Sequence, residues 1–357
     1  MMVSKPVRPP WSDSSKNLVR DIVTHASKTS FDVMGDDTFA PAWPGVSWLP
    51  VYGGRGAYAP GLMEKARALK SIVTAPRAVD AFHLFFAPNA ASGSALFPAL
   101  TIKRRPVLHT ICSVPREFAT AARWIHADVA IALSEYTANN LRSAGVNEVR
   151  LIPPGIDPER FGAPDFDHEM PRPTLLFAGD YEVGGGAERI IGCAAAVLDV
   201  VPDAHFVFAC RPKTSEAAAK EASAKAAVAA AGLMDAFTFL GEVSDVGELL
   251  RSCTVCTLPI DSTWRKMDIP LVLLEAMALG KPVLVTDRAP LREILAEGGG
   301  VEVPAADTDA LAEAIVQLFT DTERRKTLAR EAAAAVRSKW DIRKLAGTYD
   351  ALYAELA

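Results

Sequence analysis

Short apolar runs alternate with helix-length amphipathic segments along most of the 357-residue chain. In the first half, the apolar runs predict strands at residues 31–34, 46–51, 81–87, 107–112, 129–133 and 149–152. Helical periodicity fills the gaps at residues 17–27, 61–73, 94–103, 116–125 and 135–144. Strands that alternate with helices indicate a parallel, doubly wound α/β sheet. Ligands of such sheets bind beyond the carboxyl ends of the strands.

The alternation stops at a proline-rich stretch and then begins again. Four prolines lie between residues 158 and 173, which is typical of a linker. After them, strands are predicted at 174–178, 204–209, 237–240, 254–258, 283–285 and 301–303, and helices at 187–198, 215–231, 246–251, 271–279, 288–295, 309–319, 322–339 and 341–356. Because 357 residues exceed one ordinary core, we expect two domains, residues 1–160 and 161–340, followed by a terminal segment, 341–357.

One apolar helix carries an unexpected acid. Pro270 suits its first turn, and Gly280 with Pro282 ends it before a buried strand. Glu275 lies inside this helix, next to its apolar face. The acid either belongs to a solvated outward face or directs its carboxylate at a polar ligand where the helix meets the sheet edge.

The net charge of −5 hides an asymmetry between the two halves. Residues 1–160 carry 18 Lys and Arg against 13 Asp and Glu, whereas residues 161–357 carry 20 against 30. The basic half could attract an anionic substrate or a membrane surface, although scattered surface charge is an alternative. No nucleic-acid partner is expected, because the chain has no dense run of Lys and Arg and no aromatic platform.

The hydropathy and the cysteines indicate where in the cell the protein is expected. No apolar run is long enough to span a bilayer, and the first eleven residues contain no signal-peptide core. We expect a cytoplasmic protein, and association with the inner face of the membrane is left open. The five cysteines fit a reducing compartment. Cys253 and Cys256 have zinc or redox spacing, but their apolar strand and the lack of a second pair favour core packing.

Three polar features lie at predicted strand ends. The loop 9–17 ends in good N-cap residues, so Ser15 and Lys16 could present backbone N–H groups to a ligand, and a simple capped loop is the alternative. His109 ends a buried strand and is either a core group or a site residue. The strand ending near Gly179 leads into the glycine triplet 184–186, which resembles a phosphate cradle but lacks the P-loop lysine.

Four segments in order resemble one family. They are 127–136 (ADVAIALSEY), 151–161 (LIPPGIDPERF), 239–243 (FLGEV) and 270–285 (PLVLLEAMALGKPVLV). They resemble the "ADxVIAxSE", "IPNGVD…F", "FLGxV" and "GLVLLEAMAxGKPVVAT" elements of retaining GT-B glycosyltransferases, the family 4-like enzymes also called glycosyl transferases group 1. The match runs from about Val107 to the C-terminus, and its most specific part contains Glu275.

The resemblance implies two Rossmann-like domains that face a cleft, with a nucleotide-sugar donor on the C-terminal domain and an acceptor on the N-terminal one. The last helix would cross back to the N-terminal domain. The implied donor ligands are the Glu275 carboxylate for the ribose, the backbone N–H groups of Leu271 and Val272 for the diphosphate, Gly241 and Glu242 near the base, and Gly179 and Arg211 at strand ends. No cofactor and no metal is expected, because helix dipoles and basic side chains offset the charge of the leaving group.

Several positions depart from the family pattern. The first acid of the family's Glu-x7-Glu falls on Met267, and Asp268 beside it is the candidate substitute. Two cations that the family places beside the diphosphate fall on Asp180 and about Gly184. The candidate replacements are Arg265, Lys266, Arg211, Lys213 and Arg189. The family's acceptor-side histidine falls on Cys112, and His109 would point to the opposite face of the strand.

The leading hypothesis is a retaining glycosyltransferase (EC 2.4 class) with Arg265, Lys266, Asp268 and His109 as candidate catalytic residues. Its acceptor is a saccharide, a lipid-linked sugar or a small molecule. The first alternative is a GT-B-shaped binding or partner subunit that has lost catalysis, which the missing cations motivate. The second is a different sugar reaction on the same fold, since fold does not determine chemistry. The sugar, the base, the acceptor and the oligomeric state are left open.

Overall fold

The chain forms two compact α/β units in a computed structural model that describes residues 1–36, 38–53, 60–167, 170–243 and 246–357. The N-terminal unit contains Met1–Gly155, Arg265–Asp268 and Ile342–Ala357. The C-terminal unit contains Ile156–Trp264 and Ile269–Asp341. Three segments of the chain therefore form the N-terminal unit, and one of them is only four residues long.

The sheet of the N-terminal unit has seven parallel strands in the order β3-β2-β1-β4-β5-β6-β7. The strands are β1 Met2–Val3, β2 Phe31–Asp36, β3 Val46–Tyr52, β4 Phe82–Phe85, β5 Val107–Thr110, β6 Val129–Ala132 and β7 Val149–Leu151. The prediction missed β1, which pairs Met2 with both Val33 and His83 at the centre of the sheet. Two residues are too few to produce an apolar run.

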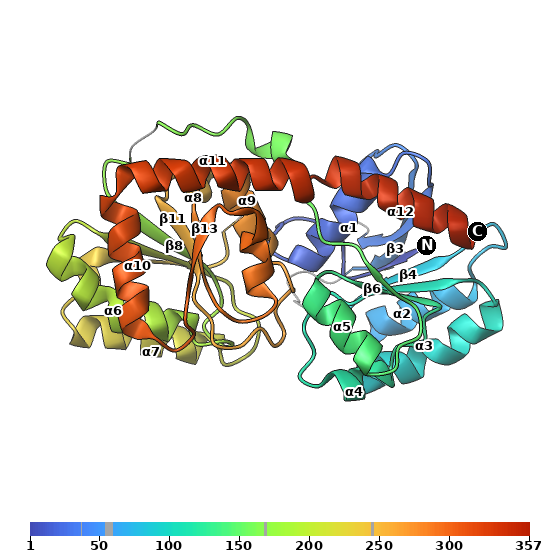
Figure 1. Ribbon diagram of the computed structural model, residues 1–357. Coiled ribbons are helices and arrows are strands. Elements are labelled where there is room, and N and C mark those ends of the chain that lie inside the picture. Colours follow the sequence, from blue (N-terminus) through green and yellow to red (C-terminus); the bar gives the residue numbers. More distant parts are fainter. Residues whose placement is uncertain (37, 54–59, 168–169, 244–245) are drawn as a thin grey trace. The chain divides into compact units, whose positions relative to one another are not determined.

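Helices cover both faces of this sheet (Figure 1). They are α1 Ser14–His25, α2 Leu62–Val73, α3 Ala90–Lys103, α4 Phe118–Ala122, α5 Glu135–Ser143 and α12 Ile342–Leu356. Helix α12 packs beside α1 on one face, and α2 and α3 lie side by side on the other. The buried side chains of α2 and α3, such as Ile72 and Leu100, share one hydrophobic core with Phe82 and Val107 of the sheet.

The sheet of the C-terminal unit has six parallel strands in the order β10-β9-β8-β11-β12-β13. The strands are β8 Thr174–Gly179, β9 His205–Cys210, β10 Phe237–Leu240, β11 Val255–Leu258, β12 Val283–Thr286 and β13 Gly300–Val303. The helices are α6 Gly186–Val200, α7 Ala217–Ala230, α8 Val246–Arg251, α9 Leu271–Ala278, α10 Thr308–Thr320 and α11 Thr322–Lys339, with 3-10 turns η1 Pro158–Phe161, η2 Met234–Ala236 and η3 Leu291–Glu297. The α-helix predicted at 288–295 is the 3-10 turn η3.

The predicted doubly wound α/β fold is confirmed. The strands of each sheet are parallel, so their carboxyl ends lie along one edge of the sheet, where such folds bind ligands. None of the helices in the described residues is long and apolar enough to cross a membrane.

A buried carboxylate attaches α12 to the N-terminal unit. Asp350 is 6% exposed. Its Oδ2 accepts hydrogen bonds from the backbone N–H groups of Ser27 (2.9 Å) and Lys28 (3.1 Å), and its Oδ1 accepts one from the hydroxyl of Thr29 (2.6 Å). The end of α1 and the last helix are thereby held together across more than 320 residues of sequence.

Asp350→Ala should lower the free energy of unfolding by about 2–4 kcal/mol, because three donors lose a buried, charged acceptor. Urea unfolding followed by tryptophan fluorescence measures this change. Glu355→Ala, on the exposed side of the same helix, removes only a surface pair with Arg150 and serves as the control. Equal unfolding midpoints for the two variants would show that Asp350 does not anchor the helix.

Candidate functional site

Helix α9 follows the carboxyl end of β11 and is almost entirely buried. Leu271, Leu274 and Met277 are each no more than 1% exposed. Pro270 precedes the helix with a φ of −64°, which suits this position because proline has no N–H to satisfy. The N–H groups of Leu271 and Val272 lie in the first turn, where an α-helix offers them no acceptor. The helix therefore presents two donors and the positive end of its dipole at its start.

Glu275 is buried inside this apolar helix. It is 4% exposed, so the interpretation as a solvated outward face is wrong. Its Oε1 lies 3.5 Å from the guanidinium Nη2 of Arg160, which comes from η1 and is itself partly exposed. A buried carboxylate requires compensation, and this pair is long for an ion pair. The arrangement joins two of the segments that carried the family resemblance, 151–161 and 270–285.

The strand-end loops of the C-terminal unit are held by a buried ion pair. Lys213 Nζ lies 2.6 Å from Oδ2 of Asp180, the residue after β8, and both side chains are largely buried. Asp180 Oδ1 also accepts a hydrogen bond from the N–H of Val183 (2.9 Å). Glu182 Oε1 accepts from the N–H groups of Lys213 and Thr214 (3.0 and 2.9 Å). The acid at position 180 is thus neutralised by a lysine that we expected to serve as a replacement cation.

A second replacement candidate is also paired. Arg189 Nη2 lies 2.6 Å from Oδ2 of Asp261. Arg211 follows β9, and its N–H donates to the carbonyl of Gly179 (3.3 Å). The pairs 180–213 and 189–261 each sum to zero charge. Much of the positive potential at this sheet edge must therefore come from groups such as the helix N-termini.

The glycine triplet has a packing role. Gly184 and Gly185 have φ values of +92° and +71°, which residues other than glycine rarely adopt. A Cβ on Gly184 would lie 2.9 Å from Ile260, and one on Gly186 would lie 2.9 Å from Phe177. Close approach of the loop to the sheet therefore explains why glycine is needed here. Gly241 and Glu242 lie exposed after β10, where a ligand can reach them.

The segment Arg265–Asp268 belongs to the N-terminal unit although α9, which begins three residues later, does not. The N–H of Val114 donates to the carbonyl of Lys266 (2.9 Å), and the N–H of Arg265 donates to the carbonyl of Val114 (3.1 Å). The hydroxyl of Ser134 donates to Asp268 Oδ2 at 2.6 Å. Arg265 has a φ of +60°, an uncommon conformation that this pairing holds in place.

Two side chains of the segment 265–268 are buried. Asp268 is fully buried and Lys266 is 7% exposed. Ser134 also accepts a hydrogen bond from the N–H of Thr137 (3.0 Å), so one hydroxyl both caps α5 and holds the segment. The contact between Ser134 and Asp268 could not be predicted, because the two residues are 134 positions apart in the chain. The interpretation of Asp268 as a substitute for the family acid at Met267 stays a prediction.

His109 lies in β5 and is 1% exposed. Its Nε2 lies 3.0 Å from the carbonyl of Phe86, so this nitrogen carries the proton and donates. Burial lowers the pKa of His109 to about 4, which leaves the ring neutral near pH 7. His83, which our sequence analysis did not single out, is also buried, and its ring contacts Tyr353 and Thr110 (2.7 Å each). Burial lowers the pKa of His83 well below its ordinary value.

The start of α1 is capped by the chain itself. Asp13 Oδ1 accepts hydrogen bonds from both the N–H and the hydroxyl of Ser15, and its Oδ2 pairs with Lys5 at 2.9 Å. The ammonium of Lys16 lies 6.0 Å from the centre of the Trp11 ring. The N–H of Ser15 is therefore used by the cap, as the alternative of a capped loop predicted. The binding of a donor by Ser15 and Lys16 stays a prediction.

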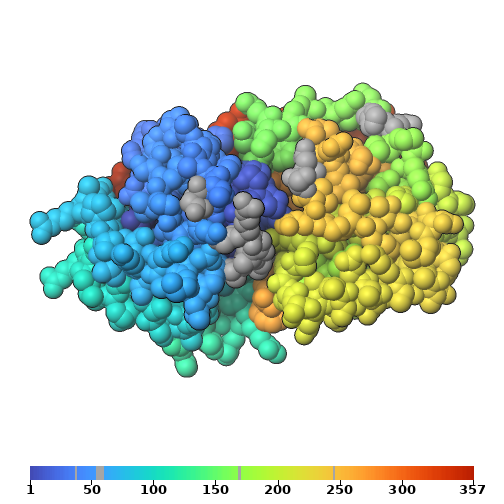
Figure 2. Space-filling model, turned by 180° about the vertical axis from the view of Figure 1, so that it is seen from behind, coloured from blue at the N-terminus to red at the C-terminus, as the bar shows by residue number. Residues whose placement is uncertain are grey.

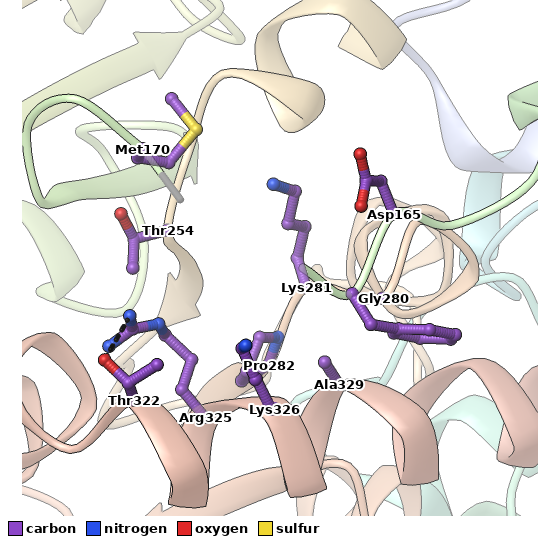
Figure 3. Close-up of a pocket in the computed structure, with 11 residues that line it drawn as sticks. Asp165, Met170, Thr254, Gly280, Lys281, Pro282, Thr322, Arg325, Lys326 and Ala329 are labelled. Carbon is purple, nitrogen blue, oxygen red and sulfur yellow. Dashed lines mark hydrogen bonds between the residues drawn. The ribbon is translucent and has the colours of Figure 1, made fainter. Parts of the chain in front are cut away.

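A small pocket of about 40 Å³ lies at the amino ends of β11 and β12, away from the start of α9. Figure 3 shows the Lys281 side chain extending between Met170 and Asp165, while Arg325 hydrogen-bonds the hydroxyl of Thr322 (3.1 Å). This volume holds one or two water molecules, so the pocket is too small for a nucleotide. Within the described ranges no three His, Cys, Asp or Glu side chains gather in a way that could hold a metal ion.

Two family models match the chain. The model described as Glycosyltransferase Family 4 matches residues 19–160, and the one described as Glycosyl transferases group 1 matches residues 172–321. Together they cover most of both units.

Curated relatives match over shorter spans. A phosphatidyl-myo-inositol mannosyltransferase of Mycobacterium leprae is 31% identical over 174 residues, which is 47% of this chain and 43% of that protein. The enzyme of the same name from Mycobacterium tuberculosis is 28% identical over 282 residues, 74% of this chain and 71% of that protein. The chain spans about half the length of the first curated relatives that it matches.

Solved structures share the fold over almost the whole chain. A sucrose-phosphate synthase from Thermosynechococcus elongatus has a TM-score of 0.82 at 20% identity, covering 99% of this chain and 98% of that one. HepE of Anabaena, solved in complex with UDP, has a TM-score of 0.76 at 16% identity and covers 99% of both chains. The arrangement of each unit is therefore that of GT-B glycosyltransferases.

Ser134→Ala should free the segment 265–268, because Asp268 loses its hydroxyl donor. A hydrogen bond to a charged group contributes about 1.5–3 kcal/mol, so local opening should increase about tenfold or more. Trypsin cleaves after Arg265 and Lys266, and mass spectrometry of a limited digest measures the rate. Ser134→Thr keeps the hydroxyl and should cleave slowly, as should Ser143→Ala at the exposed end of α5. An unchanged rate in Ser134→Ala would show that the hydrogen bond does not hold the segment.

His109 should make stability depend on pH. Its pKa is about 4 when folded and about 6.5 when unfolded. Stability is complete above pH 6.5 and falls as the pH drops toward 4, because only the unfolded state takes up the proton, at a total cost of about 3 kcal/mol. Denaturant titrations at several pH values measure this slope. His109→Gln should reduce it and exposed His126→Gln should not, and equal slopes in all three proteins would contradict the account.

Proposed function

Because this chain belongs to the glycosyltransferases, with a family 4 domain and a group 1 domain, we propose that it transfers a sugar from a nucleotide-diphosphate sugar to an acceptor with retention. The two-unit GT-B fold supports this proposal, since each sheet offers its carboxyl edge to one substrate. In this proposal the C-terminal unit holds the donor and the N-terminal unit holds the acceptor.

The observation that carries the proposal is the buried Glu275 in α9. An acid that is 4% exposed in an apolar helix is costly unless it serves a polar partner. We assign its carboxylate to the ribose hydroxyls of the donor, and the N–H groups of Leu271 and Val272 to the diphosphate. Arg160, 3.5 Å away, compensates the carboxylate until the ribose arrives. Gly241 and Glu242 are the proposed neighbours of the base, and Gly179 and Arg211 line the adjoining strand ends.

The proposed chemistry needs little from acidic or basic side chains. The acceptor hydroxyl attacks the anomeric carbon on the face from which the diphosphate leaves, the glycosidic C–O bond to phosphate breaks, and the departing phosphate oxygen takes the hydroxyl proton. Aligned donors stabilise the charge that develops on the diphosphate, and one such donor contributes about 3–4 kcal/mol. No metal is assigned a role. His109 is buried and its ring N–H donates to the carbonyl of Phe86, so the scheme assigns it no role as a base.

The cations of the 265–268 segment complete the proposal. Arg265 and Lys266 are the candidates to replace the family's diphosphate-binding cations, because Lys213 is already paired with Asp180. Strong pairing of the segment to Val114 and Ser134 gives these side chains fixed backbone positions. Preorganised charges cost little reorganisation during reaction, which is the main benefit of such positioning.

The relatives guide the choice of substrates to test. Named relatives act on phosphatidyl-myo-inositol or build lipopolysaccharide cores, and HepE was solved with UDP. We propose a lipid-linked or saccharide acceptor at the inner face of the membrane. The donor base and sugar are to be found with a panel of UDP-, GDP- and ADP-sugars.

Glu275→Gln should weaken nucleotide binding and raise the KM for the donor about tenfold or more, because a charge-assisted hydrogen bond to the ribose is lost. Thermal shift with UDP, GDP and ADP measures binding, and donor hydrolysis measures turnover. A ligand at 100 times its Kd adds about 2.7 kcal/mol of stability, which such a scan resolves. Glu302→Gln on the exposed edge strand β13 is the matched control.

Two results would contradict the proposal. One is the absence of turnover with every donor together with no thermal shift from any nucleotide, which would favour a partner subunit without catalysis. The other is a donor-dependent activity that Glu275→Gln leaves unchanged.

A further inference from the structure

The small pocket at the amino ends of β11 and β12 is positively charged. Lys281 enters it from the turn after α9, and Arg325 and Lys326 enter it from the first two turns of α11 (Figure 3). Among the described residues that line the pocket, Asp165 is the one acid, so their formal charges sum to +2. Residues 161–357, in contrast, carry 20 Lys and Arg against 30 Asp and Glu. The pocket therefore concentrates positive charge in an acidic part of the chain.

Arg325 is held in place and keeps donors that are not used. Its Nη1 donates to the carbonyls of Leu318 (3.0 Å) and Phe319 (3.1 Å) at the end of α10, and its Nη2 donates to the hydroxyl of Thr322 (3.1 Å). A guanidinium has five N–H groups, so two of them have no acceptor in the described part of the chain. A fixed guanidinium with two remaining donors is a preformed ligand for an oxyanion.

Lys281 is half-buried, and its ammonium has neither a hydrogen-bond acceptor nor an ion-pair partner among the described residues. It therefore does not cap the last carbonyl groups of α9, which it follows in the chain. Burial lowers the pKa of Lys281, whereas the negative charges of Cys253 and Asp165 act in the opposite direction. A cation that has lost part of its hydration is stabilised by an anion beside it.

Lys326 is paired only at the rim of the pocket. Its Nζ lies 3.1 Å from Oδ1 of Asp167, whose side chain is 80% exposed. Ion pairs with such exposed acids contribute little to stability, so a ligand with more charge can take the place of Asp167. Figure 2 shows the bright-green segment 156–167 at the surface of the C-terminal unit. Solvent ions can therefore reach the rim that this segment forms.

We propose that this pocket binds a single phosphate group, which belongs either to inorganic phosphate or to a small phosphate monoester. The two lysines and the arginine approach the pocket from different sides in Figure 3. Donors from several directions suit the tetrahedral oxygens of phosphate better than the two planar oxygens of a carboxylate. The volume of about 40 Å³ limits the ligand to one such group, with some of its oxygens in solvent at the rim.

This site is separate from the proposed donor site. Helix α9 begins at Leu271, where we place the diphosphate of the donor, whereas Lys281 comes after the other end of that helix. A phosphate group at each end of α9 would have no ligand in common. The inference does not depend on the transfer reaction.

Calorimetric titration of the full chain with inorganic phosphate tests the proposal, with chloride added to keep the ionic strength constant. We expect a Kd of about 1 mM or below. Lys281→Gln and Lys326→Gln should each weaken binding about tenfold, because each removes a charge-assisted hydrogen bond. Acetate should bind much more weakly than phosphate. Titration with glycerol phosphate distinguishes the two sources, since an affinity equal to that of inorganic phosphate shows that a monoester fits.

Arg330→Gln is the matched control. Arg330 is exposed on the same helix and does not line the pocket, so its loss changes the net charge equally and should leave phosphate binding unchanged. Circular dichroism checks the folding of the three variants. Lys326 lies at the rim, so its variant keeps the test valid even where Lys281→Gln disturbs the fold.

Arsenate, a tetrahedral analogue of phosphate, locates the site by anomalous scattering in crystals of the full chain. We expect a peak within hydrogen-bonding distance of Lys281 Nζ and the Arg325 guanidinium, and no such peak in Lys281→Gln. The proposal would be overturned by a peak only at the start of α9, by binding at crystal concentration only, or by an equal loss in Arg330→Gln. A protein that binds phosphate beside Lys281 and transfers no sugar would support this inference and contradict the proposed function.

Discussion

The hydrogen bond from Ser134 to Asp268 is the constraint on which the proposed site depends. It joins residues 134 positions apart and, with the two backbone bonds to Val114, assigns Arg265–Asp268 to the N-terminal unit. Pro270 follows two residues after Asp268, and α9 begins at Leu271. The helix that we propose to bind the donor therefore begins three residues after a segment that a hydroxyl of the N-terminal unit holds.

The charge balance of the C-terminal unit is the reason why the position of the segment 265–268 matters for the proposed site. The family places cations beside the diphosphate, whereas this chain has Asp180, and the buried pair with Lys213 cancels it. Breaking a buried pair is costly, so Lys213 is held by the fold rather than available to a ligand. Arg189 is likewise engaged by Asp261. The N–H groups of α9 and the cations at 265 and 266 then become the principal candidates for stabilising the leaving group.

Local features of the chain could be predicted from the sequence, and long-range pairings could not. Pro270 and Gly280 fixed the limits of α9 to within a residue, since capping depends on neighbouring positions. Strand β1 was missed because a two-residue strand has no periodicity. The contacts Ser134–Asp268 and Lys213–Asp180 depend on which loops the fold brings together. His83 looked like an ordinary strand residue until Tyr353, 270 residues away, was seen beside it.

The most direct test is a crystal structure of the full chain with a saturating nucleoside diphosphate. The account predicts phosphate oxygens within hydrogen-bonding distance of the N–H groups of Leu271 and Val272, the ribose hydroxyls on Glu275, and an intact Asp180–Lys213 pair. A nucleotide bound elsewhere, or one whose phosphates are held by Lys213 after the pair with Asp180 has broken, would contradict it.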